Sequence, residues 1–117
     1  MTNLKDRLDA IGIVVDWIDA CKERRLDVLL DLYDEEATVE CCEGSDFTGR
    51  SQLERYWQPR LARAGRDAFA IDALMPEADG VSLDYCNYDG RRMRMHFRFT
   101  QAGKIRLTAC EVIRLAA

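Results

Sequence analysis

The sequence is poor in the residues that mark several common protein classes. Its 117 residues include two prolines, seven glycines and one histidine, which excludes a collagen-like or proline-rich chain and a zinc site built from several histidines. Basic residues are not in excess, since 17 lysines and arginines face 21 acids. No apolar run approaches the roughly 20 residues of a membrane-spanning helix. We therefore expect neither a nucleic acid nor a membrane as a partner.

The length and the first residues indicate a single intracellular domain. Charged residues interrupt the stretch from Met1 to Ala20, so it lacks the apolar core of a signal peptide. We expect a cytoplasmic protein. A chain of this size suits one compact domain, and no linker or repeat divides it. The sequence predicts one domain over residues 1–117, with 48% hydrophobic residues to supply a core.

The five cysteines are odd in number, and no two of them have the C-x-x-C spacing. On a strand, the neighbouring Cys41 and Cys42 would face opposite sides, which argues against a shared metal ion. We interpret all five as small apolar residues with reduced thiols, and we expect neither a metal nor a cofactor. They are Cys21, Cys41, Cys42, Cys86 and Cys110.

Apolar residues at spacings of three and four predict helices in the first half of the chain. A shorter helix should follow the first, and the residues it turns inward should be Leu26, Leu29, Leu30 and Tyr33. Ser51 and Glu54 form a capping-box pattern that predicts the start of a third helix, and Pro59 predicts a kink or an early end. The apolar positions of the first helix are Leu4, Leu8, Ile11, Val15 and Ile18.

The rest of the chain has the alternation of β-strands. Residues 37–42 are β-prone, and 47–48 are a candidate return strand. After Gly65 come four more strands, with hairpin signals at 79–80 and 89–90. The clearest is 92–99, which has apolar residues on one side and three arginines with His96 on the other. Three helices gathered on one face of a curved antiparallel sheet give an α+β cone.

Several stretches of sequence resemble the nuclear transport factor 2-like superfamily, in particular its SnoaL-like and ketosteroid-isomerase-like branch of small bacterial proteins. The passage from helix to strand at 32–40, the sequence Phe-Thr-Gly-Arg-Ser at 47–51 and the hairpin at 98–105 carry this resemblance. It implies a cystatin-like roll, which is a cone-shaped domain with an internal cavity.

The resemblance also places three catalytic positions. Steroid isomerases of this fold use a carboxylate base and an oxyanion hole made by a tyrosine and a protonated aspartic acid, an arrangement that depends on tuned pKa values. The matching positions here hold Cys41, Trp17 and Met95. None of these side chains supplies the required group, so we expect no steroid isomerisation. His96 lies on the opposite strand face, where an interface or surface position is the expected one.

The resemblance and the alternation together predict a pocket. We expect the protein to bind a small apolar metabolite inside the cone. A divergent isomerase, cyclase or dehydratase is one alternative, and an accessory or dimerisation module with a filled core is another. The residues expected to face the pocket are Trp17, Tyr33, Cys41, Tyr56, Trp57, Met93, Met95, Phe97, Cys110 and Val112.

The outer sheet face predicts self-association. Arg92, Arg94 and Arg98 alternate along one strand, and acidic residues lie on its neighbours. Such a mixed face can pair with a second copy of itself about a two-fold axis. We expect a homodimer through this face.

Overall fold

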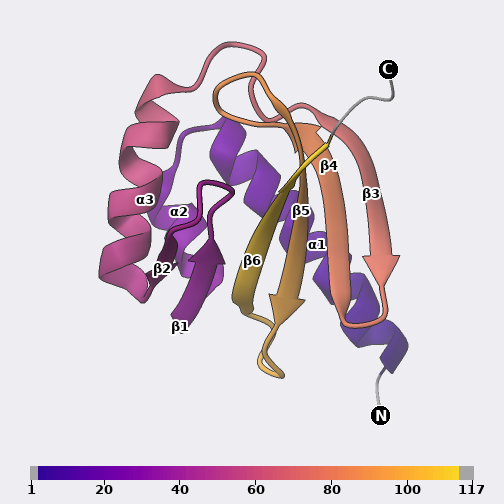
Figure 1. The fold of residues 1–117 in the computed structure, drawn as a ribbon. Coiled ribbons are helices and arrows are strands. Elements are labelled where there is room, and N and C mark those ends of the chain that lie inside the picture. The colour runs from indigo at the N-terminus through magenta and orange to yellow at the C-terminus, as the bar shows by residue number, and fades with distance from the viewer. Residues whose placement is uncertain (1–2, 114–117) are drawn as a thin grey trace.

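The computed structural model describes the backbone of residues 3–113 and the side chains of residues 10–113. Three helices and six strands make up this part of the chain, and the helices all precede β3 (Figure 1). The elements are α1 (Asn3–Lys22), α2 (Leu26–Asp31), β1 (Tyr33–Glu40), β2 (Asp46–Thr48), α3 (Arg50–Arg63), β3 (Ile71–Glu77), β4 (Gly80–Cys86), β5 (Arg92–Phe99) and β6 (Ile105–Val112).

The six strands form one sheet in the order β2-β1-β6-β5-β4-β3. Neighbouring strands run antiparallel, as the sequence predicts, except that β1 and β6 run parallel. A parallel pair needs a long connection, and here that connection contains α3 and the four strands β2, β3, β4 and β5. The sheet is therefore mixed, and β6 joins the β1–β2 hairpin to the β3–β4–β5 meander.

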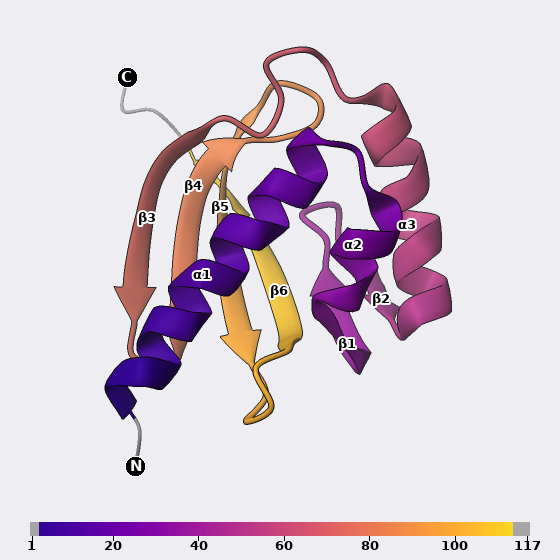
Figure 2. The same ribbon diagram turned by 180° about the vertical axis from the view of Figure 1, so that it is seen from behind.

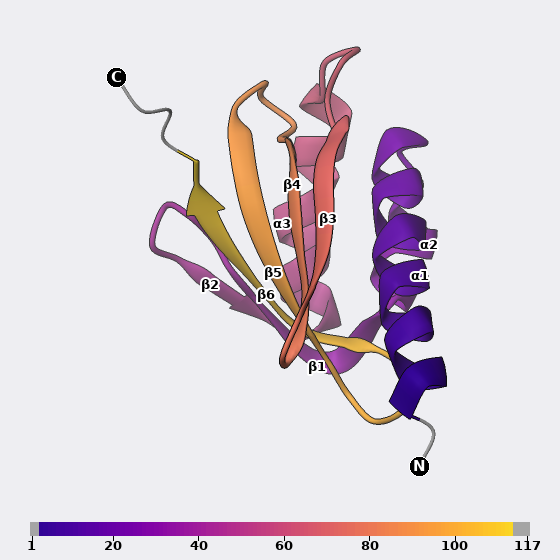
Figure 3. The same ribbon diagram turned by 90° about the vertical axis from the view of Figure 1, so that its right-hand side faces the viewer.

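The helices cover one face of the sheet (Figures 2 and 3). α1 crosses β3 and β4, while α3 lies over β1 and β2. The curvature of the sheet and the slant of α1 enclose a cone between the two layers (Figure 3). In the part of the chain that the structure describes, no helix has the length and apolar character to span a membrane.

The buried stripe of α1 is rotated from the predicted one. Val14, Trp17 and Cys21 are completely buried, whereas Val15, which we expect on the inner face, is 37% exposed. Ile18 is buried as predicted, and the side chains of Leu4 and Leu8 lie outside the described part. The large Trp17 side chain packs at the centre of the cone. Its packing therefore decides which face of α1 turns toward the sheet, against the face predicted from the aliphatic residues.

The second helix is shorter than the sequence predicts. α2 ends at Asp31, and Tyr33 begins β1. The Ile105 backbone N–H donates a hydrogen bond to the Leu32 carbonyl (N···O 2.9 Å), which ties this point of the chain to the last strand. Tyr33 is still buried, but pairing with β6 places it in a strand.

The predicted capping box at Ser51 does not form. The N-cap residue of α3 is Gly49. Its φ is 87°, a positive value that glycine adopts at low steric cost. The Gln52 side chain reaches back and accepts a hydrogen bond from the Thr48 N–H (2.8 Å). Pro59 does not end the helix, which continues to Arg63.

Hairpins form at both predicted signals, but the first turn lies one residue earlier than predicted, at 78–79, because Glu77 pairs with Gly80. Gly90 has a φ of 91°, as expected for such a turn. Gly80 instead lies so close to the Phe97 carbonyl that a Cβ atom would collide with it. The alternation of β5 is also confirmed, because Met93, Met95 and Phe97 are buried under the helices.

Candidate functional site

Aromatic rings fill the centre of the cone. Trp17 is completely buried and makes edge-to-face contacts with Trp57, Tyr85 and Phe97, with ring centroids 5.5, 5.6 and 5.1 Å away. Such contacts stabilise beyond the area they bury. The predicted pocket residues at this depth therefore pack against one another.

A small group of polar atoms lies within this aromatic core. The Trp17 indole N–H donates to the Tyr33 hydroxyl (3.0 Å). Burial raises the pKa of Tyr33 well above its usual value, and the nearby polar groups of Trp17, Trp57 and Thr108 offset this only partly. The hydroxyl therefore stays neutral, and it can donate or accept a hydrogen bond but cannot act as a base at ordinary pH.

Two buried atoms beside Tyr33 have no hydrogen-bond partner among the described residues. They are Trp57 Nε1 and the Thr108 hydroxyl. An unsatisfied buried donor costs about 1 to 3 kcal/mol. These atoms mark the most polar point of the cone interior.

The end of the cone near Cys41 has little free space. A cavity of about 20 Å³ lies there, which is room for about one water molecule. The Arg60 guanidinium closes it by stacking 3.8 Å above the Tyr56 ring, and it donates to the Tyr56 carbonyl (2.8 Å). Cys41 is half-buried beside Glu43 (Sγ···Oε1 3.8 Å).

The other predicted pocket residues divide between core and surface. Met93 and Met95 are buried in the core, and Cys110 is half-buried. Val112 is 43% exposed at the end of β6, so it does not face the interior as predicted. Val112 is the last residue of β6 and pairs with Met93 of β5, whereas the pairing of β6 with β1 reaches only to Ala109.

Cys42 and Cys110 form a disulfide, which corrects the prediction that all five cysteines are reduced thiols. The bond joins the turn between β1 and β2 to β6 across 68 positions of sequence. Cys21, Cys41 and Cys86 are free. The remaining thiols are not arranged for metal binding, and no group of three or more His, Cys, Asp or Glu in the described residues could hold a metal ion.

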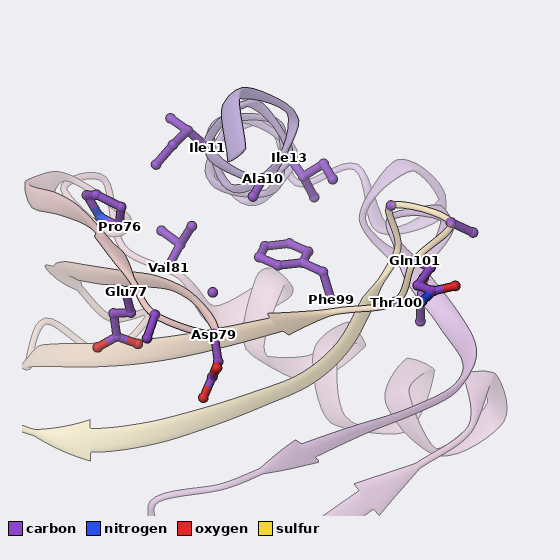
Figure 4. Close-up of a pocket in the computed structure, with 14 residues that line it drawn as sticks. Ala10, Ile11, Ile13, Pro76, Glu77, Asp79, Val81, Phe99, Thr100 and Gln101 are labelled. Atoms are coloured by element: carbon purple, nitrogen blue, oxygen red, sulfur yellow. The ribbon is translucent and has the colours of Figure 1, made fainter. Parts of the chain in front are cut away.

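An open pocket lies at the opposite end of the cone, and sequence reasoning did not find it. Its volume is about 570 Å³, within the range of small-molecule sites. It separates α1 from the β3–β4 and β5–β6 turns (Figure 4). We call it the α1 pocket. Its lining residues include Ala10, Ile11, Ile13, Val81 and Phe99.

Apolar side chains face the interior of the α1 pocket. Ile13 and Ala10 lie above the Phe99 ring (Figure 4), and Val81 lies beside it. Glu77 and Asp79 also border the pocket, but their carboxylates point away from α1 (Figure 4). The pocket therefore offers an apolar surface with its charges at the rim.

Comparison with known proteins identifies the family. The sequence profile described as the SnoaL-like domain matches residues 14–117. The chain belongs to the SnoaL-like family. A search of the curated proteins found no match.

Solved structures share the fold of this SnoaL-like domain. One is a SnoaL-like protein of unknown function from Burkholderia thailandensis, with a TM-score of 0.83 and 20% identity, covering 92% of this chain and 98% of the other. A protein with a cystatin-like fold from Methylobium petroleophilum has a TM-score of 0.74 and 21% identity, over 95% and 80% of the chains. An NTF2-like protein from Cytophaga hutchinsonii has a TM-score of 0.72 and 12% identity, over 89% of each chain. At these identities the likeness shows the fold alone.

The outer face of the sheet in this SnoaL-like domain carries a network of ion pairs. His96 Nδ1 lies 3.2 Å from the Glu77 carboxylate, and Nε2 lies 3.1 Å from Glu111. Arg98 also binds Glu77 (3.1 Å). Beside them Arg94 donates two hydrogen bonds to Asp84 (2.7 and 3.0 Å). Both ring nitrogens of His96 are therefore engaged, and the homodimer through this face stays a prediction.

The network shifts the pKa values of its members. Burial alone would lower the pKa of His96, but its bonds to Glu111 and Glu77 outweigh burial and raise it above its ordinary value of 6.5. Burial would raise the pKa of Glu77, but bonds from His96 and Arg98 lower it instead. The hydrogen bond from Arg94 lowers the pKa of Asp84.

We expect the protein to lose stability as the pH rises above the ordinary histidine pKa of 6.5. A raised folded-state pKa means that the contribution of His96 is complete below 6.5 and is lost as pH rises through the folded value. Urea unfolding across this range measures the slope. His96 is the single histidine, so His96→Gln should remove the histidine part of the slope. An equal decline in the variant would contradict the assignment.

Proposed function

We propose that this SnoaL-like domain binds a small, mostly apolar molecule, and that it does so in the α1 pocket. The observation that carries the proposal is the volume of about 570 Å³ beside the apolar side chains of Ile13, Val81 and Phe99. Burying apolar ligand surface there contributes about 25 cal/mol for each Å² removed from water. The cavity beside Cys41 is far smaller, at about 20 Å³.

The chemistry of the α1 pocket supports binding rather than catalysis. A general acid or base has to lie within hydrogen-bond reach of the reacting group. The carboxylates of Glu77 and Asp79 point away from the pocket interior (Figure 4). Glu77 is moreover held by His96 and Arg98 on the outer sheet face. Neither of these carboxylates in the described lining is therefore placed to transfer a proton to a ligand in the pocket.

A pocket-filling substitution tests this proposal. Ala10→Phe should weaken binding of the uncharged fluorophore N-phenylnaphthylamine, because Ala10 lies directly above Phe99 in the pocket (Figure 4). Fluorescence titration of the wild-type protein should show saturable binding. The measurement is the dissociation constant, and we expect Ala10→Phe to weaken binding by at least about tenfold, which is about 1.4 kcal/mol.

The control is Val15→Phe, which adds an aromatic ring to the exposed side of the same helix. It should bind the probe like the wild-type protein. Equal binding by both variants would place the probe elsewhere, and no saturable binding by the wild-type protein would overturn the proposal.

A further inference from the structure

A second hollow lies at the other end of α1, and its walls are basic. It has a volume of about 330 Å³ and is formed by the last turn of α1 and the connection between α3 and β3. We call it the basic hollow. Its lining residues are Lys22, Arg24, Arg66, Asp67, Ala68 and Ala70.

The Arg24 side chain is fixed at the centre of this region. Its Nη1 donates to the carbonyls of Cys21 (3.1 Å) and Lys22 (2.8 Å). Its Nη2 donates to those of Ala64 (3.2 Å) and Gly65 (2.9 Å). These four bonds hold the end of α1 against the α3–β3 connection. The guanidinium charge therefore has a defined position before any ligand arrives.

The backbone around the basic hollow is strained at two points. Arg24 and Phe69 have φ values of 58° and 70°, and they are the non-glycine residues with positive φ in the described chain. The Arg24 guanidinium lies over the Phe69 ring, 5.5 Å from its centroid. Such conformations are unfavourable for residues with a Cβ atom and persist where the surrounding structure holds them. The shape of the hollow is therefore set by the fold.

The charges of the hollow are unbalanced. Lys22 and Arg66 are exposed, and neither forms an ion pair with another residue among positions 10–113. Asp67 is the single acid in the lining, against three cations. The complete chain has a net charge of −4, so this excess of positive charge is local. Clustered cations in one hollow attract an anion, because its binding relieves their mutual repulsion.

We propose that the basic hollow binds a small oxyanion, namely phosphate or the phosphate group of a small ester. The oxygens of a phosphate group are arranged tetrahedrally, so they can accept hydrogen bonds from donors on different sides of the hollow. Hydrogen bonds from lysine or arginine to phosphate are charge-assisted and roughly twice as strong as neutral ones. Lys22 and Arg66 supply mobile donors from the two segments that border the hollow. Arg24 supplies fixed charge and keeps those segments at their spacing.

Titration followed by amide NMR tests the proposal with inorganic phosphate and with phenyl phosphate at low ionic strength. Amide signals of residues 22–25 and 64–70 should shift saturably. The double variant Lys22→Ala with Arg66→Ala should weaken binding by about tenfold or more, because it removes both exposed cations of the lining. Asp67→Asn should strengthen binding, because it removes the one repulsive charge. Tighter binding of phenyl phosphate would assign the hollow to an ester, and tighter binding of inorganic phosphate would assign it to the free anion.

The control removes the same amount of charge elsewhere, through Arg55→Ala with Arg106→Ala. Both arginines are exposed, on α3 and β6, and this variant should bind like the wild-type protein. Equal weakening in the two double variants would mean that net charge alone attracts the anion. That result, or the absence of saturable shifts in the wild-type protein, would overturn the proposal. Arg24 is left unchanged, because its four carbonyl contacts hold the fold.

Discussion

Trp17→Ala should lower the free energy of unfolding by about 3 to 5 kcal/mol. The indole ring is completely buried and touches the rings of Trp57, Tyr85 and Phe97. Its removal leaves a cavity where the two layers meet, and it also removes the hydrogen bond to the Tyr33 hydroxyl. Urea unfolding followed by far-UV circular dichroism measures the effect.

The matched control for this variant is Val15→Ala. Val15 lies on the same helix but is 37% exposed, so its truncation should cost much less than that of Trp17. If Trp17→Ala lost less than about 1 kcal/mol, the cone centre would not be packed as described. If Trp17→Ala is too unstable to purify, Trp17→Phe takes its place. Trp17→Phe keeps an aromatic ring but lacks the indole N–H, so its loss of unfolding free energy should lie between those of Val15→Ala and Trp17→Ala.

Removing the disulfide should have the next largest effect on stability. The double variant Cys42→Ser with Cys110→Ser should lower the free energy of unfolding by about 2 to 4 kcal/mol. The bond closes a loop that spans 68 positions, and opening it gives the unfolded chain more conformational freedom. Chemical denaturation of the oxidised wild-type protein and the variant gives the difference.

Cys86→Ser is the control, since Cys86 is a free, half-buried cysteine outside the bond. Intact mass under non-reducing conditions should show two hydrogens fewer than the fully reduced protein. A wild-type protein that carries five thiols after purification in air would contradict the disulfide, and the double variant should then be as stable as the wild type.

The alternation of β5 was sufficient to predict its two faces. Burial has a period of two along a strand, and Met95 and His96 fall on opposite sides for that reason alone. The α1 stripe was predicted less well. Val15 fits the aliphatic pattern, but the tertiary packing of Trp17 decides which side faces the sheet.

The disulfide and the α1 pocket depend on information that no local pattern contains. Cys42 and Cys110 meet because β1 pairs in parallel with β6, and the sequence patterns predicted antiparallel neighbours. The pocket depends on how far α1 stands from the turns after Glu77 and Phe99. Ile13 and Phe99 are ordinary apolar positions in their helix and strand patterns. That they line the same pocket follows only from the three-dimensional arrangement.

The place of β6 in the sheet has a consequence for synthesis on the ribosome. β6 is the last strand of the described chain to emerge, yet it lies between β1 and β5. Until it pairs, β1 and β5 each present an open edge, and such edges pair readily with other chains. Closing the sheet also requires contacts between distant parts of the chain, which form slowly. The nascent protein is therefore most prone to aggregation in the interval between the emergence of β5 and the insertion of β6.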